Sequence, residues 1–270
     1  MDYNLITNIA SCHIDIPGLL YYSHIPPAII VLLSGIFILL KVKGKEDRLV
    51  GKILFFISIL FFTWVSVEGA IWLLYSSVSM SFLWSLLGIL YVSIHILSIY
   101  FVYVVIDKKD ISPNKKYIFA ILLLPIIFLT STKYNITGFD VVNCQAIEGI
   151  YFIVYRYLIG ITSIIWIITF LYLRYKKANR ELKKQILLLG FGILSFLLLF
   201  SWSEITGSIT QNFEITQYGL FGMPVFMAFL VYLIVRYKAF NIKLIGAEAL
   251  VIAIIILTGS QFSYIRNPTN

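Results

Sequence analysis

The chain has 270 residues, of which 60% are hydrophobic and 13% are charged, and its mean hydropathy is +0.93. A soluble globular protein is about 45–50% apolar and about 25% charged, so this composition excludes an ordinary soluble domain. Several apolar runs reach the roughly 18 residues needed to cross a bilayer, and they must be helices because lipid offers unpaired backbone groups no partner. The sequence therefore predicts an all-α fold, a polytopic membrane helix bundle.

Eight apolar segments follow one another along the chain. They cover residues 26–42, 53–75, 80–106, 117–132, 150–173, 186–210, 215–235 and 245–265. The first seven are expected to form a membrane domain at 26–236, after an extracytoplasmic segment at 1–25. A cytoplasmic joint at 237–246 and an eighth membrane helix with its tail at 247–270 are expected to follow. Because residues 1–25 lack the basic start of a signal peptide, the first apolar run, after Pro26 and Pro27, should be an uncleaved anchor.

The basic residues fall almost entirely on alternate connections. All 21 lysines and arginines except Lys133, Arg156 and Arg266 lie between segments one and two, three and four, five and six, or seven and eight. Because basic loops stay in the cytoplasm, we expect a multi-pass protein of the cell (inner or cytoplasmic) membrane with its N-terminus outside. The net charge of +8 then reflects topology, and the expected partners are membrane lipids, with no nucleic acid.

The two cysteines, Cys12 and Cys144, are both expected on the outer side of the membrane. That side is usually oxidising, so an even pair there indicates a disulfide. The bond would hold the N-terminal segment over the mouth of the bundle, and it would add about 4–5 kcal/mol of stability in the simple entropy model. Two free thiols in an anaerobic cell are the alternative.

Four ionisable residues lie inside the predicted helices, where charge is costly and usually faces the bundle interior. Three of them, Glu68, Arg156 and Glu204, lie about 9–10 Å below the outer ends of their helices. At a common depth, the forked guanidinium of Arg156 can bridge both carboxylates. The fourth, His95, lies near the midplane and is expected to be a hydrogen-bonded interior residue.

This charge cluster has two compatible interpretations. It is a structural ion-pair network that fixes helix register, or it is a ligand or stimulus pocket open to the outside. The pocket would be lined by the residues Glu68, His95, Arg156, Glu204, Trp64, Trp72, Tyr155 and Trp202. His13 and His24 flank its mouth, and histidine titrates near neutral pH.

The sequence offers little to support catalysis. It contains no glycine-rich phosphate loop, no HExxH and no GxSxG, and the intramembrane groups suggest no nucleophile–base pair. No second histidine or cysteine lies at metal-ligand spacing, so we expect no metal and no cofactor. The chain itself is not expected to be an enzyme.

The seventh segment ends in a basic connection that is expected to transmit motion. Its outer half carries Gly219, Gly222 and Pro224, a composition that suits either a hinge or ordinary close helix packing. The expected transmission residues are Pro224, Arg236, Lys238 and Lys243. The connection after Tyr237 alternates apolar and basic residues, as an interfacial link does.

Four stretches of the chain carry a resemblance to a known family. They are PGLLYYSHIPPAI (17–29), CQAIEG (144–149), LKKQILLLGFGI (182–193) and GLFGMPVFMAFLVYLIVRYKAFNIKLIGAEALV (219–251). Together they resemble the amino-terminal seven-transmembrane region of a group of bacterial sensor histidine kinases. The resemblance implies a sensor in a two-component system, with seven sensing helices, a further membrane segment and a cytoplasmic, dimerising kinase that phosphorylates a response regulator.

The chain departs from that family because it contains no kinase, and the family's catalytic residues have no counterpart here. A gene fragment, a deliberately shortened chain and a stand-alone membrane subunit all fit this departure. We expect a receptor module for an unknown small-molecule or physical stimulus, which forms a homodimer if it follows the family. A small multi-pass transporter is the main alternative, although no internal repeat is visible, and a membrane-embedded enzyme is a third.

Overall fold

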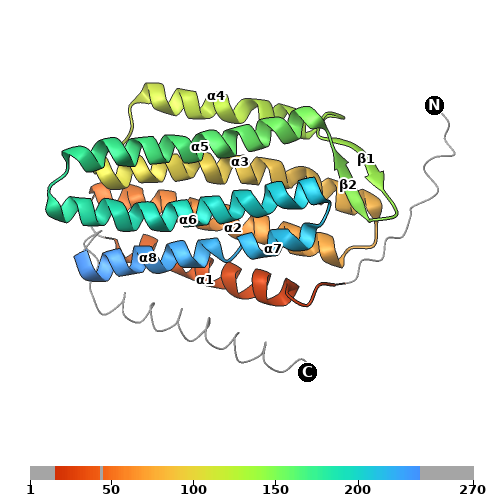
Figure 1. Ribbon diagram of the computed structural model, residues 1–270, viewed down its shortest axis with the longest axis horizontal. Helices are drawn as coiled ribbons and strands as arrows, with labels where there is room; N and C mark the ends of the chain where they lie inside the picture. Colours follow the sequence, from red (N-terminus) through yellow and green to blue (C-terminus); the bar gives the residue numbers. More distant parts are fainter. Residues whose placement is uncertain (1–15, 43–44, 238–270) are drawn as a thin grey trace.

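The structure, a computed structural model, describes residues 16–42 and 45–237. Seven helical spans in this part of the chain are long and apolar enough to cross a membrane, and they lie side by side in one bundle (Figure 1). This confirms the predicted all-α membrane bundle. The elements are α1 Leu20–Lys41, α2 Lys45–Leu73, α3 Ser77–Asp107, α4 Pro113–Thr130, β1 Ile136–Asp140, β2 Gln145–Glu148, α5 Ile150–Lys177, α6 Arg180–Thr210, the 3-10 helix η2 Phe213–Ile215, α7 Thr216–Gly219 and α8 Gly222–Tyr237.

The bundle has two chemically different ends. At the hairpin end, on the right of Figure 1, lie β1, β2, the start of α1 and the connections α2–α3 and α6–α7. At the opposite, basic end lie the connections α3–α4 and α5–α6, with the lysines and arginines that flank them. Helix α4 lies at the edge of the bundle, and its main contacts with other helices are those with α3 and α5. Most of its surface is therefore free to face lipid.

Two predicted helix boundaries were wrong because apolarity alone underestimates helix length. Helix α6 begins at Arg180 rather than 186, and α5 continues to Lys177 rather than 173. The basic residues between them therefore lie on helix ends, not in a long loop. Lysine and arginine permit this because their aliphatic stems extend along the helix while the charge stays in water. Cations at the C-terminus of α5 also interact favourably with the negative end of the helix dipole.

The first helix begins at Leu20 rather than 26, so Pro26 and Pro27 lie inside it. Proline is tolerated within membrane helices when other groups satisfy the backbone. The first turn is supported by its own side chains, since Ser23 Oγ and His24 Nδ1 both contact the Leu20 carbonyl, at 3.2 and 3.0 Å. His24 is also held by a second helix, so tertiary contact stabilises a turn that the sequence pattern did not predict.

The seventh predicted segment, residues 215–235, is interrupted in the structure. Helix α7 ends at Gly219 and α8 begins at Gly222, so the break falls at residues 220–221. Pro224 lies in the first turn of α8, where a missing N–H removes no helical hydrogen bond. The predicted joint at 237–246, except for Tyr237 at the end of α8, and the predicted eighth helix lie outside the described residues.

Aromatic rings fill the centre of the bundle. Phe61 and Trp64 of α2 pack edge to face against Phe200 of α6, with ring centroids 6.2 and 4.9 Å apart. Phe196 stacks on Phe226 of α8 at 6.2 Å. All five side chains are at most 1% exposed. Offset and edge-to-face rings add about 0.5–1.5 kcal/mol per pair beyond burial, so this layer joins α2, α6 and α8 firmly.

Replacing Gly219 with alanine should destabilise the bundle by about 1–3 kcal/mol, the usual cost of overpacking a filled site. A Cβ at this position would collide with Ser203 Oγ and would approach the Leu199 carbonyl to 2.9 Å. The measurement is thermal unfolding in detergent. Gly18→Ala is the matched control, because a Cβ there meets nothing within 4 Å, and equal melting temperatures for the two variants would contradict the close contact between α7 and α6.

Candidate functional site

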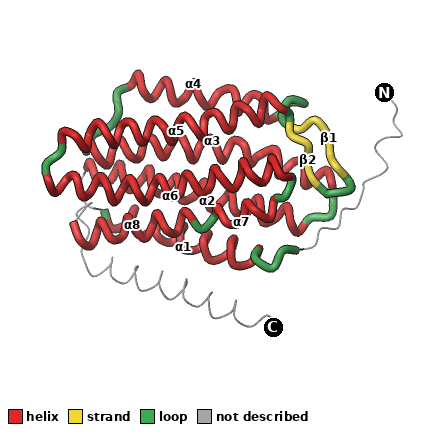
Figure 2. The backbone as a smooth tube through the Cα atoms, in the orientation of Figure 1, coloured by secondary structure: helices red, strands yellow, loops and turns green. Residues whose placement is uncertain are grey.

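The β1–β2 hairpin covers one end of the bundle and is tied to the helices below it. The two strands pair antiparallel, with Asp140 opposite Gln145 (Figure 2). The buried Asn135 donates to the carbonyls of Ser85 and Thr130, at 3.1 and 3.0 Å, and Gln145 Nε2 donates to the Gln211 carbonyl at 3.2 Å. The sequence predicted only a loop here. Strands this short gain their stability from the helices that they cover, so the pattern of their own residues does not reveal them.

The hairpin positions Glu148, the last residue of β2, directly over Arg156 of α5. The guanidinium donates two parallel hydrogen bonds, from Nη1 to Oε1 at 2.8 Å and from Nη2 to Oε2 at 2.9 Å. The two side chains are only 3% and 5% exposed. Nη2 also contacts the Tyr157 hydroxyl at 3.0 Å, and that hydroxyl donates to the Glu204 carbonyl of α6 at 3.0 Å.

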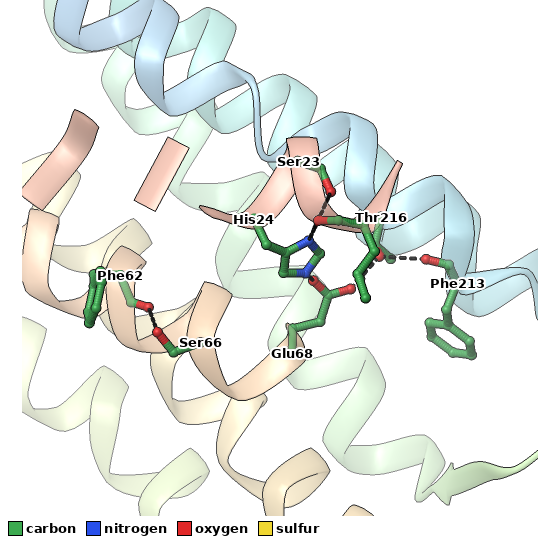
Figure 3. A network of polar contacts seen from close by, with 8 residues as sticks. Ser23, His24, Phe62, Ser66, Glu68, Phe213 and Thr216 are labelled. Carbon is green, nitrogen blue, oxygen red and sulfur yellow. Dashed lines mark hydrogen bonds and ion pairs between the residues drawn. The ribbon is translucent and has the colours of Figure 1, made fainter. Parts of the chain in front are cut away.

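A second polar network joins three helices through Glu68 of α2 (Figure 3). One carboxylate oxygen contacts Nε2 of His24 from α1, and the other accepts a hydrogen bond of 2.8 Å from the hydroxyl of Thr216, the first residue of α7. The Nδ1 atom of His24 lies 2.8 Å from Ser23 Oγ. Glu68 therefore holds the starts of α1 and α7 together.

These two networks border one cavity at the hairpin end. Its volume is about 50 Å³, measured as the space open to the centre of a water molecule. A single water needs roughly 10–15 Å³ by this measure, so the cavity holds only a few water-sized groups. Its lining comprises Trp64, Glu68, Ile71, Trp72, Trp84, Leu87, Asn143, Cys144, Gln145, Glu148, Arg156, Glu204, Phe213 and Thr216.

The structure brings the predicted Glu68, Arg156 and Glu204 to this cavity but pairs them differently. Arg156 was expected to bridge Glu68 and Glu204, and this was wrong, because its two Nη atoms bind Glu148. Glu68 instead takes His24 and Thr216 as partners. Sequence reasoning missed Glu148 because it lies outside the apolar runs. The available signal was its position two residues before the apolar start of α5, where the chain folds back over the bundle.

Two of the four aromatic residues that were predicted to line a pocket lie at this cavity. Trp64 and Trp72 line the cavity, together with Trp84 and Phe213, which the sequence did not indicate. Tyr155 faces α4 instead, where its hydroxyl donates to the Leu122 carbonyl at 2.6 Å. Trp202 is 56% exposed on the outer surface of α6. Helix phase decides this difference, because Trp202 is adjacent in sequence to residues whose side chains face inward.

His95 belongs to a separate, deeper cluster and does not line the cavity. Its Nε2 lies 2.9 Å from Ser201 Oγ and its Nδ1 lies 2.9 Å from the Tyr91 carbonyl. The Tyr91 hydroxyl donates to the same Ser201 oxygen at 2.9 Å. Ser201 and His95 are thus within the distance of a nucleophile–base pair, which the sequence did not suggest. Both are buried, at 4% and 0% exposure, and neither lines the cavity, so their interior hydrogen bonding is as expected for His95.

The remaining predicted residues lie at the edge of what the structure describes. Cys144 lines the cavity and is disulfide-bonded. Cys12 lies outside the described residues, so the pairing of the two cysteines stays a prediction. Lys238 and Lys243 also lie outside, and Arg236 is described only as part of the α8 backbone.

Comparisons with protein families, with curated proteins and with solved structures find no match to the chain. The function is therefore argued from the geometry of the cavity and from the sequence.

Removing Arg156 should cost the stability that its buried pairing provides. We expect Arg156→Met to destabilise the protein by about 3–5 kcal/mol, because it leaves the Glu148 carboxyl group buried and unpaired. The double variant Arg156→Met, Glu148→Met should be less destabilised than the single one. The measurement is a double-mutant cycle by unfolding in mixed micelles.

The control for this cycle is the pair of Lys116 and Asp110, whose side chains are 47% and 45% exposed. An exposed pair of this kind contributes about 0–1 kcal/mol. Coupling energies of similar size for the two pairs would contradict the importance of the buried one.

The hairpin turn should loosen in acid because of Asp140. Hydrogen bonds from the Asn143 amide and from the backbone N–H groups of Val142 and Asn143 lower the pKa of Asp140. The stabilisation is therefore complete above the unfolded pKa of about 3.9, and it is lost as pH falls through the lower folded pKa. Hydrogen-exchange protection factors of residues 141–148 should fall between pH 5 and pH 2.5, and Asp140→Asn should abolish this difference.

Proposed function

We propose that this chain is the membrane-embedded receptor module of a two-component sensor histidine kinase, which detects a stimulus in the cavity at the hairpin end. The observation that carries the receptor proposal is the double contact of Glu68. This carboxylate borders the cavity and also accepts the hydrogen bond that starts α7. A change in the cavity therefore acts directly on the span that α7 and α8 form.

The geometry of α7 supports a moving part at this position. The helix spans only Thr216–Gly219, and the break at residues 220–221 separates it from α8. A hydrogen bond to a charged group contributes about 1.5–3 kcal/mol. Losing or gaining the bond from Thr216 to Glu68 would therefore change the population of two α7 positions by roughly tenfold or more.

The layer below the cavity favours a receptor over the alternative of a transporter. Trp64 lines the cavity and packs edge to face on Phe200. Phe200 in turn stacks on Tyr91 and on His95, with centroids 5.4 and 6.1 Å away. A transporter would open its site to both sides of the membrane in turn, and this close-packed layer separates the cavity from the basic end.

The direction of signalling follows from the charge distribution and the family resemblance. Basic connections favour the cytoplasm, which would place the cavity outside and the end of α8 inside. The resemblance of residues 219–251 to a sensor-kinase segment supports a kinase as the output partner. The signal would pass from Glu68 through α7 and α8 to that partner.

The proposal is tested by removing the charge of Glu68 and following α8. A trifluoromethyl label on Tyr232→Cys, which is 49% exposed on α8, reports the position of that helix by fluorine NMR. Glu68→Gln and Thr216→Val should each shift or split this resonance, because both weaken the bond that holds α7.

Glu214→Gln is the control variant, because it removes the same charge from an exposed residue at the same end of the bundle. An unchanged label spectrum in both Glu68→Gln and Thr216→Val, with the fold intact, would rule out transmission through α7.

A further inference from the structure

Glu204 presents a carboxylate without a partner to the cavity. Glu68 contacts His24 and accepts from Thr216, and Glu148 accepts from Arg156. Within the described part of the chain, no donor forms a hydrogen bond with the carboxylate of Glu204, although this residue is only 7% exposed and lines the cavity. A carboxyl group that is buried without a hydrogen-bond partner is unfavourable, so this position can take a donor from outside the protein.

The charges around the cavity leave an excess of negative charge. Among the described residues, Glu68, Glu148 and Glu204 line it, and Arg156 is the cation that lines it with them. Arg156 attracts Glu204 through space, but its Nη atoms are already bound to Glu148. His24 contacts Glu68 and Arg156 binds Glu148, so each of these two acidic groups has a basic partner and Glu204 has none. The cavity is therefore complementary to one added positive charge.

The walls of the cavity suit an organic cation. Trp64, Trp72, Trp84 and Phe213 line it, and Trp84 meets Phe213 edge to face with centroids 4.8 Å apart. Aromatic faces attract cations through their quadrupole and also accept alkyl groups. The volume of about 50 Å³ corresponds to roughly four water-sized groups, which limits the ligand to a small molecule.

We infer that the cavity binds a small organic cation, an alkylammonium of about four non-hydrogen atoms. Its ammonium group donates to the Glu204 carboxylate, and its alkyl part lies against the aromatic residues of the wall. This assignment rests on the proposed receptor function, because it names the chemical class of the stimulus. Binding neutralises Glu204 beside Glu68, and so changes the electrostatic environment of the bond that holds α7.

Four-atom probes of different charge test this assignment on the full chain in lipid nanodiscs. Propylammonium, 1-propanol and acetate have the same number of non-hydrogen atoms and are cationic, neutral and anionic. Tryptophan fluorescence, with sodium chloride added to equal ionic strength, follows binding at the cavity. Propylammonium should bind saturably, and at least about tenfold more tightly than the other two, as expected when a charge-assisted hydrogen bond distinguishes them.

The matched variants locate the binding. Glu204→Gln should weaken propylammonium binding at least about tenfold, whereas Glu214→Gln, an exposed acidic residue at the same end, should leave it unchanged. Equal binding of 1-propanol and propylammonium would mean that Glu204 is neutral and would overturn the assignment. Unaltered binding of propylammonium to the Glu204→Gln variant would also overturn the assignment.

The two proposals fail separately. If propylammonium does not bind while the fluorine label on α8 still responds to Glu68→Gln, the ligand class is wrong and the receptor coupling stands. If propylammonium binds at Glu204 while the label on α8 responds to neither variant, the ligand class stands and the receptor coupling is wrong.

Discussion

The structure of the hairpin end depends on the neutralisation of Arg156 inside the bundle. A guanidinium that is 2% exposed among apolar helices is stable only if its charge is matched at hydrogen-bonding distance. Glu148 supplies that match through two parallel bonds, and it reaches Arg156 only because the chain folds into a hairpin before α5 begins. The ion pair therefore holds the hairpin in place over the helices, and the hairpin in turn closes the cavity beneath it.

Aromatic packing and polar contacts hold different levels of the bundle together. Below the cavity, stacked and edge-to-face rings from α2, α3, α6 and α8 form a close-packed layer. Above it, the helices meet through hydrogen bonds to carboxylates, which are directional and depend on charge. In the receptor that we propose, a change in the cavity would act first on these charge-dependent contacts.

Helix α7 is the element where these two layers meet. It begins at Thr216, whose hydroxyl donates to Glu68, and it ends at Gly219. The absence of a Cβ at Gly219 lets α7 approach Ser203 and the backbone of α6. The break at residues 220–221 separates it from α8. The short helix is thus held both by the hydrogen bond from Thr216 to Glu68 and by close packing against α6.

The sequence by itself determined the class of the fold and several of the charged residues that line the cavity. Hydrophobic runs long enough to span a bilayer can only be helices, so the seven spans followed from composition and length. The cost of buried charge likewise singled out Glu68, Arg156 and Glu204, and all three line the cavity. These properties are local, because they depend on residue type and on position along a helix.

Only the tertiary structure decided which charges pair and which aromatic rings face the cavity. Glu148 lies in a connection and His24 lies before two prolines, so neither belonged to an apolar run, yet they became the partners of Arg156 and Glu68. Trp202 and Tyr155 turned away from the cavity because helix rotation and neighbouring helices set their direction. Partner choice depends on distances between segments far apart in the chain, and those distances arise only when the helices pack.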